Sequence, residues 1–170
     1  LFLEDDIAEK IVKKAIQKAT VDLNLVSFKD LINIIISGAA NITYENFKVH
    51  KRTSKSKKLD SGFSCILDGD KRKEFPIEKD LFFLYSDDSP ELFLVKEYLK
   101  LNPNPSLNYH LTSNPHCLFM KMVEFNLCLD TNDAFEICWN NFMSTQNGID
   151  FLESLKDFLI AECMFFSPNL

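Results

Sequence analysis

Apolar positions recur with a helical period over much of this chain, most densely towards its C-terminal end. Three apolar segments follow one another there, at 116–129, 133–143 and 149–166. The first is apolar all round, which predicts a buried helix, and the last has an apolar stripe opposite charged residues. We interpret 115–166 as a core helical unit onto which the earlier chain packs. Its large apolar residues are expected to seed the core: Phe119, Met122, Phe135, Trp139, Phe151, Leu155 and Phe158.

The N-terminal part of the chain predicts two more helices. Asp5 or Asp6 caps a strongly amphipathic helix that runs to about residue 23. Ser27 and Asp30 resemble a capping box, and they predict a second helix over the nearly continuous apolar run at 28–37. We expect this second helix to be buried.

Strand and turn signals interrupt the helical pattern in the middle of the chain. The segments 63–67 and 75–77 flank the dipeptide Asp68-Gly69, which is typical of a small β-hairpin. Ser89 and Pro90 then open a helix that extends to residue 101. The predicted fold class is mainly α: a single-domain helical bundle of about six helices over residues 1–170, with a small β-hairpin inserted in the middle.

A basic stretch precedes the predicted hairpin. From residue 48 to residue 58 the chain holds six Lys or Arg and no acid, so we expect 48–62 to be a mobile basic loop. Lys51-Arg52-Thr53-Ser54 resembles a phosphorylation site for a basophilic kinase. Together with the cations after the predicted turn, the loop forms a basic patch: Lys51, Arg52, Lys55, Lys57, Lys58, Lys71, Arg72 and Lys73.

Three uses of this basic patch are open. The clusters Lys57-Lys58 and Lys71-Arg72-Lys73 are separated by residues 59–70, which resembles a bipartite nuclear-import signal. The same cations could make weak, salt-sensitive contacts to nucleic-acid phosphates. The third interpretation is a solvated linker without a partner.

Composition narrows the class of protein. A net charge of −6 over 170 residues argues against a protein built as a whole to hold nucleic acid. The five cysteines are odd in number and lack a CxxC pair, which favours reduced thiols in an intracellular protein. No apolar run is long enough for a membrane span. We expect a nuclear or cytoplasmic location, with the basic clusters favouring the nucleus, and no membrane partner.

Signatures of catalysis are weak. The sequence lacks GxxxxGK[ST], GxGxxG, HExxH and GxSxG. His110, His116 and Cys117 lie close together in sequence, but no second ligand pair accompanies them, and Asp87 and Asp88 suit the positive end of a helix dipole. The sequence therefore predicts no catalytic, cofactor-binding or metal-binding residues and no cofactor. An unrecognised enzyme is the minority alternative.

The first predicted helix presents a ridge of small and aliphatic residues. The ridge comprises Ala8, Ile11, Val12, Ala15, Ile16 and Ala19, with polar residues between the steps. It resembles the docking helix of A-kinase anchoring proteins, and this resemblance implies a regulatory subunit of protein kinase A as the partner. The same pattern also describes a helix that packs onto its own domain.

These observations lead to two function hypotheses. The first is a non-enzymatic intracellular module for protein–protein interaction, such as a nuclear scaffold or a regulatory subunit domain. The alternative is a docking domain that binds a kinase regulatory subunit through the helix at 8–19, or nucleic acid through the basic loop. The sequence leaves the identity of the partner and the oligomeric state open.

Overall fold

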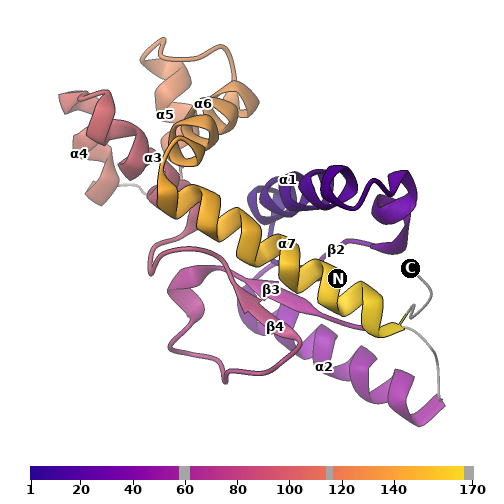
Figure 1. Ribbon diagram of the computed structural model, residues 1–170. Helices are drawn as coiled ribbons and strands as arrows, with labels where there is room; N and C mark the ends of the chain where they lie inside the picture. The colour runs from indigo at the N-terminus through magenta and orange to yellow at the C-terminus, as the bar shows by residue number, and fades with distance from the viewer. Residues whose placement is uncertain (58–61, 114–116, 167–170) are drawn as a thin grey trace. The chain divides into compact units, whose positions relative to one another are not determined.

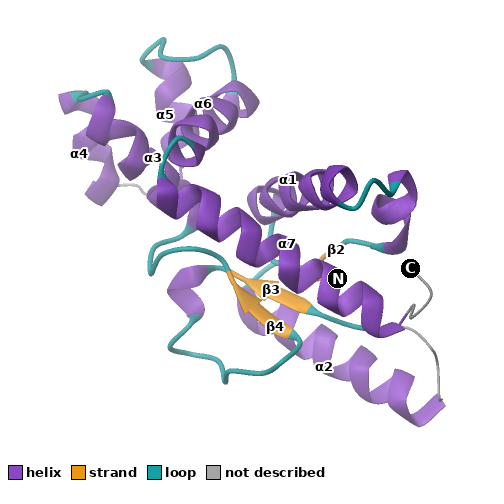
Figure 2. Cartoon of the chain, in the orientation of Figure 1, coloured by secondary structure: helices purple, strands orange, loops and turns teal. Residues whose placement is uncertain are grey.

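The chain divides into two compact units. The computed structural model describes residues 1–57, 62–113 and 117–166 (Figure 1). Unit 1 comprises Leu1–Asp87 and Phe151–Leu170, and unit 2 comprises Asp88–Asp150. The described part of the chain is mainly helical, as Figure 2 shows. It also contains a small parallel sheet of four short strands.

Unit 1 is built on that sheet. Its strands are β1 (Phe2–Leu3), β2 (Ile35–Ile36), β3 (Cys65–Leu67) and β4 (Leu81–Phe83), in the order β2-β1-β3-β4. All three pairings are parallel, with Phe2 opposite both Ile35 and Cys65. The carboxyl ends of the strands therefore lie at one edge of the sheet.

Helices connect these strands across both faces of the sheet. Helix α1 (Asp6–Asp22) and the 3₁₀ helix η1 (Val26–Leu31) lie between β1 and β2, and α2 (Ala40–Lys57) leads from β2 to β3. The chain moves from β1 to β2 in one direction and then returns past β1 to β3. Because such crossovers are right-handed, they place α1 and α2 on opposite faces (Figure 1).

Successive residues of the short strands point to opposite faces of the sheet, so the core of unit 1 has two layers, one on each face. Phe2, Cys65 and Leu67 face α2, where they pack with Tyr44 and Phe47. The intervening strand residues point to the face that carries α1 and the C-terminal part of α7 (Gln146–Phe166).

On that second face, aromatic side chains of the sheet meet α7. The Phe82 ring centroid lies 5.2 Å from that of Phe158 and 6.4 Å from that of Phe151. Leu155 is fully buried on the same helix.

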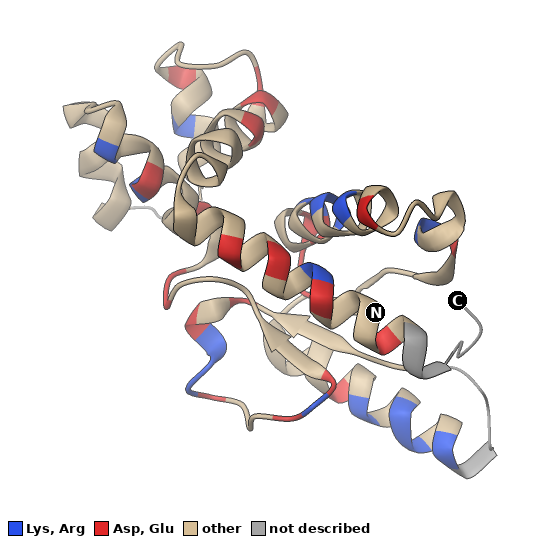
Figure 3. Cartoon of the chain, in the orientation of Figure 1, with Lys and Arg blue, Asp and Glu red and all other residues tan. Residues whose placement is uncertain are grey.

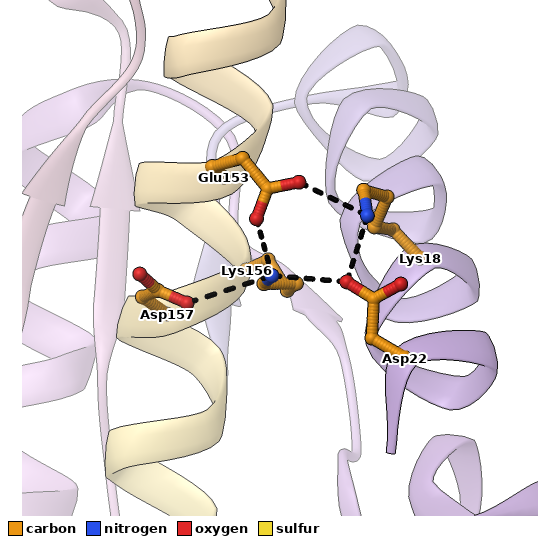
Figure 4. A network of polar contacts seen from close by, with 5 residues as sticks. All are labelled: Lys18, Asp22, Glu153, Lys156 and Asp157. Carbon is orange, nitrogen blue, oxygen red and sulfur yellow. Dashed lines mark hydrogen bonds and ion pairs between the residues drawn. The ribbon is translucent and has the colours of Figure 1, made fainter. Parts of the chain in front are cut away.

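A network of ion pairs joins α1 to α7 within unit 1 (Figure 4). Lys18 Nζ lies 2.7 Å from Asp22 and 3.0 Å from Glu153. Lys156 Nζ lies 3.0 Å from Asp22 and also contacts Glu153 and Asp157. Hydrogen bonds to Glu153 and Asp22 raise the pKa of Lys156, so the ammonium stays charged at neutral pH.

Unit 2 is a small helical cluster. It contains α3 (Pro90–Leu101), α4 (Pro105–Ser113), α5 (Leu118–Glu124) and α6 (Thr131–Met143). The rings of Phe93 and Phe142 lie edge to face with centroids 4.8 Å apart, and Phe135 stacks on Trp139 at 6.0 Å. Glu91 Oε1 accepts the Phe119 backbone N–H at 2.7 Å, which fixes the start of α5 on α3.

Three predicted elements differ from the structure. The predicted hairpin is wrong, because β3 and β4 are parallel neighbours and Gly69 begins the 3₁₀ helix η2 (Gly69–Lys71) instead of a two-residue turn. The apolar run at 28–37 is split between η1 and the edge strand β2. Within the predicted loop 48–62, residues 48–57 complete α2, and 58–61 lie outside the described residues.

The predicted core residues are nearly all buried but serve two cores. Phe119, Met122, Phe135 and Trp139 are buried in unit 2, whereas Phe151 and Leu155 are buried, and Phe158 half-buried, in unit 1. The segment 115–166 is therefore not one self-contained unit.

Candidate functional site

Two acidic residues lie side by side at the edge of the sheet where the carboxyl ends of the strands meet. Glu4 directly follows β1, and Asp68 directly follows its parallel neighbour β3. In the order β2-β1-β3-β4, the chain reverses direction between β1 and β3. Ligands of open parallel sheets bind outside the carboxyl ends of the strands at such a switch point. The fold thus places these two acids where a ligand is expected.

Glu4, Asp68 and Asp70 form a cluster that we call the acidic edge. The Asp68 backbone N–H donates to Glu4 Oε1 at 2.7 Å, which ties the ends of β1 and β3 together. Asp68 is only 8% exposed. Asp70 lies one residue beyond Gly69 in η2, and its Oδ2 lies 3.2 Å from Lys71 Nζ.

The acidic edge holds buried oxygens that are unsatisfied. In the described part of the chain, three buried side-chain polar atoms have no hydrogen-bond partner: Ser37 Oγ, Asp68 Oδ1 and Asp70 Oδ1. Ser37 follows β2, so all three belong to residues at or just beyond the carboxyl ends of strands. A buried polar atom without a partner costs on the order of 1 to 3 kcal/mol, so a group that bonded to these oxygens would stabilise the fold.

Burial and neighbouring acids disfavour the ionised forms of Glu4 and Asp68. Burial, followed by the negative charge of Glu4, raises the pKa of Asp68 to about 8. Burial also raises the pKa of Glu4 to about 7, although the hydrogen bond from the Asp68 N–H acts in the opposite direction. The charges of Asp5 and Asp70 raise both pKa values further, and Lys71 lowers both. A bound cation would favour the ionised forms of both carboxyls, so its binding would release protons.

The neighbouring charged residues have structural contacts of their own. Asp5 caps α1, since its Oδ1 accepts the N–H groups of Ile7 at 2.9 Å and Ala8 at 2.8 Å. Lys71 reaches Glu74 at 3.5 Å as well as Asp70. Asp5 is therefore fixed as a cap, and Lys71 only partly offsets the negative charge.

The donor set limits which ion could bind. Within the described residues, no group of three or more His, Cys, Asp or Glu side chains is arranged to hold a metal ion by itself. A hard ion such as Mg²⁺ commonly takes one or two protein carboxylates and completes its shell with water and phosphate oxygens. Asp68 Oδ1 and Asp70 Oδ1 suit this mode, and the absence of a sulfur or imidazole ligand disfavours Zn²⁺.

The predicted docking ridge on the first helix is not at the surface. All six residues, Ala8, Ile11, Val12, Ala15, Ile16 and Ala19, are buried in α1 at 7% exposure or less. In this fold the ridge packs within unit 1, so binding of a kinase regulatory subunit would require α1 to detach. The docking hypothesis remains a prediction that carries this extra cost.

The structure separates the predicted basic patch into two groups of cations. Lys51, Arg52 and Lys55 lie on α2, as the row of blue bands in Figure 3 shows. Lys51 pairs with Asp80 and also lies 3.7 Å from Glu78.

The other cations follow the acidic edge. Arg72 and Lys73 both pair with Asp87, at 3.3 and 3.2 Å. The Lys57 side chain and all of Lys58 lie outside the described residues, and the import and phosphate-contact hypotheses remain predictions.

The other chemical candidates are placed apart from the acidic edge. Asp88 pairs with Lys96 at 2.7 Å in unit 2, where it lies before α3 as a helix-start acid should. His110 lies on α4 and Cys117 precedes α5, while His116 is outside the described residues. All five cysteines are free thiols.

Comparisons with known proteins found no relative from which a function could be inferred. No protein family model, no curated protein and no solved structure matches this chain. Among the described residues, no helix is both long and apolar enough to cross a membrane.

Proposed function

We propose that the acidic edge binds a divalent cation, Mg²⁺ or Mn²⁺, and that unit 1 uses it to act on a phosphate ester. The observation that carries this proposal is Asp68, a carboxylate that is 8% exposed and has an oxygen without a partner. Its place at the sheet's switch point, beside Glu4 and Asp70, supports the proposal.

Energetics favour an ion over a purely structural role. Burying a carboxylate without a cation or full hydrogen bonding destabilises a folded protein. Arg or Lys would normally neutralise such a group, but Lys71, the cation that lowers the pKa of Asp68, is held by Asp70 and Glu74. A divalent ion that bridges Asp68 and Asp70 would coordinate both oxygens that have no hydrogen-bond partner.

The choice of substrate class follows from the ion. Mg²⁺ held by one or two carboxylates keeps coordination positions for phosphate oxygens and water. In such sites the ion stabilises charge on the phosphoryl group and makes bound water a better nucleophile. Glu4 lies next to these ligands, where its carboxylate is placed to accept a proton from such a water.

The test combines ion binding with turnover. Chelator-treated protein is titrated with Mg²⁺ by calorimetry and then incubated with bis(p-nitrophenyl) phosphate in Mg²⁺, Mn²⁺ or EDTA. Wild type should bind the ion and release nitrophenolate only when the ion is present. Asp68→Asn and Asp70→Asn should each weaken binding at least tenfold, because each removes a ligand charge.

Asp30→Asn is the matched control, since Asp30 is an exposed acid on η1 of the same unit. It should bind and turn over as wild type does. Absence of binding by wild type, or equal binding by Asp68→Asn, would refute the proposed site. Binding without hydrolysis would retain the ion site and reject the proposed action on a phosphate ester.

A second candidate is the protein-interaction module that the sequence predicts. It is favoured by large apolar side chains that are exposed at the end of α1 and in η1, among them Val21 at 71% and Val26 at 76%. Replacing both with Ser should leave the circular dichroism spectrum unchanged and should abolish capture of partner proteins from a native extract. Unchanged capture would reject this surface.

A further inference from the structure

The turn that carries two ligands of the acidic edge packs directly on the backbone of another segment. A Cβ atom on Gly69 would lie 1.9 Å from the Ser86 carbonyl oxygen and 2.5 Å from that of Leu84. Only glycine permits this approach, because any side chain would overlap both carbonyls. The positions of Asp68 and Asp70 therefore depend on where residues 84–86, the segment after β4, are held.

That segment has a bend that needs support. The Leu84 N–H donates to Leu67 O at 2.9 Å and extends the pairing of β3 with β4. Two residues later, Ser86 has φ of 77°, in the left-handed region that residues other than glycine seldom adopt. Such a conformation is strained and persists where neighbouring contacts impose it.

Arg72 supplies such a contact. Its Nη2 donates to the Leu84 carbonyl at 3.0 Å, and its Nη1 donates to Asp87 Oδ1 at 3.3 Å. The guanidinium carbon lies 5.9 Å from the centre of the Phe83 ring. The Arg72 backbone N–H also donates to Gly69 O at 3.2 Å, so one residue joins η2 to both sides of the bend.

We propose that Arg72 is a positioning residue for the proposed cation site: it holds residues 84–87 against Gly69, which sets the separation of the Asp68 and Asp70 carboxylates. This inference rests on the proposed function. Arg72 acts through the backbone, because its guanidinium donates to Leu84 and Asp87. The cation that lowers the pKa values of Glu4 and Asp68 is its neighbour Lys71.

Lys73 provides a matched control. It is also a cation paired with Asp87, at 3.2 Å, but its side chain is 82% exposed, and its ammonium donates to Asp87 alone of the two groups that Arg72 holds. Arg72→Ala and Lys73→Ala therefore remove the same charge and a bond to the same acid. Only Arg72→Ala also removes the hydrogen bond to the Leu84 carbonyl, which faces Gly69.

The experiment measures Mn²⁺ affinity by electron paramagnetic resonance, together with the melting temperature, for wild type and the two variants. Loss of a group that orients metal ligands typically weakens metal affinity by about 10- to 100-fold. We expect Arg72→Ala to fall in that range with a changed Mn²⁺ spectrum, and Lys73→Ala to stay within about twofold of wild type. Equal affinity of Arg72→Ala and wild type would overturn the inference.

A conservative variant covers the case in which Arg72→Ala does not fold. Arg72→Lys keeps the charge and one donor but loses the fork that reaches Leu84 and Asp87 together. It should melt near the wild-type temperature and bind Mn²⁺ severalfold more weakly, whereas wild-type affinity would overturn the inference. If wild type itself binds no Mn²⁺, the proposed function fails, and this result is distinct from a failure of the Arg72 assignment.

Discussion

Replacing Asp68 with Asn should make the ion-free protein more stable. The substitution keeps the shape of the side chain and removes a charge that burial and Glu4 disfavour. Residues retained for function often reduce stability, and their replacement then stabilises the fold. The same substitution should remove the stabilisation that a bound ion gives.

The pKa of Asp68 sets the magnitude. It rises from the ordinary value of 3.8 to about 8 in the fold. At about 1.4 kcal/mol per pKa unit, this difference of about four units limits the penalty to roughly 5 to 6 kcal/mol. We expect about 2 to 4 kcal/mol, because solvent that reaches the ionised carboxylate reduces its cost.

The sign of the pH dependence follows from the raised pKa. Below pH 3.8 the carboxyl is protonated in both states, and Asp68 imposes no penalty. The penalty grows as pH rises through the interval from 3.8 to about 8, because the unfolded chain ionises first, and it is complete above that range. The advantage of Asp68→Asn should therefore be large at pH 8 and small near pH 4.

Urea unfolding in EDTA, followed by circular dichroism, measures this difference. The single tryptophan, Trp139, lies in unit 2, so its fluorescence should report a transition that Asp68→Asn leaves unchanged. Adding Mg²⁺ at about a hundred times its Kd should stabilise wild type by about 2.7 kcal/mol, but not the variant. A destabilised variant, or a stability gain independent of pH, would refute the reasoning.

Three further predictions concern the parts of the fold that hold the site. Gly69→Ala should destabilise unit 1 by about 2 to 3 kcal/mol in urea unfolding, since its Cβ would meet Ser86 O, and an unchanged midpoint would contradict that contact. Phe135→Ala should destabilise unit 2 by about 3 to 5 kcal/mol when Trp139 fluorescence is followed, and a small loss would mean that Phe135 does not pack as described. Lys156→Met should lower the melting temperature slightly in low salt, and the difference should shrink in high salt because salt screens the partly exposed acids that Lys156 pairs with. A shift independent of salt would assign the effect to packing.

Helices with strong local signals could be predicted from the sequence. The Asp5 cap and the ridge from Ala8 to Ala19 defined α1, and Ser89 with Pro90 marked the start of α3. Each signal lies within one or two turns of the residues it orders, so no distant contact is needed to read it.

The sheet could not be predicted in the same way, because its strands are two or three residues long. Such strands show no period of their own, and their pairing is set by partners far along the chain. Ile35 and Ile36 therefore looked like part of a buried helix, yet they form an edge strand in which both are exposed. Asp68 and Gly69 suggested a hairpin by local turn chemistry, whereas parallel pairing moves the next strand to Leu81.

The candidate site was missed for the same reason. Glu4 and Asp68 are 64 residues apart in sequence, and only the parallel pairing of β1 with β3 brings them together. The signal that could have found them is an acid directly after each of two short apolar runs, Phe2-Leu3-Glu4 and Ile66-Leu67-Asp68. Acids in that position suit the carboxyl edge of a parallel sheet.

Anomalous diffraction from crystals soaked in Mn²⁺ tests the central claim most directly, because it locates the ion relative to named atoms. Our account predicts one Mn²⁺ peak at the end of β3, within about 2.0 to 2.3 Å of Asp68 Oδ1 and Asp70 Oδ1, with Glu4 beside it. The peak should be absent from crystals of Asp68→Asn. A map of wild type without a peak at this edge, or with Asp68 Oδ1 bonded to a protein cation instead, would contradict the account.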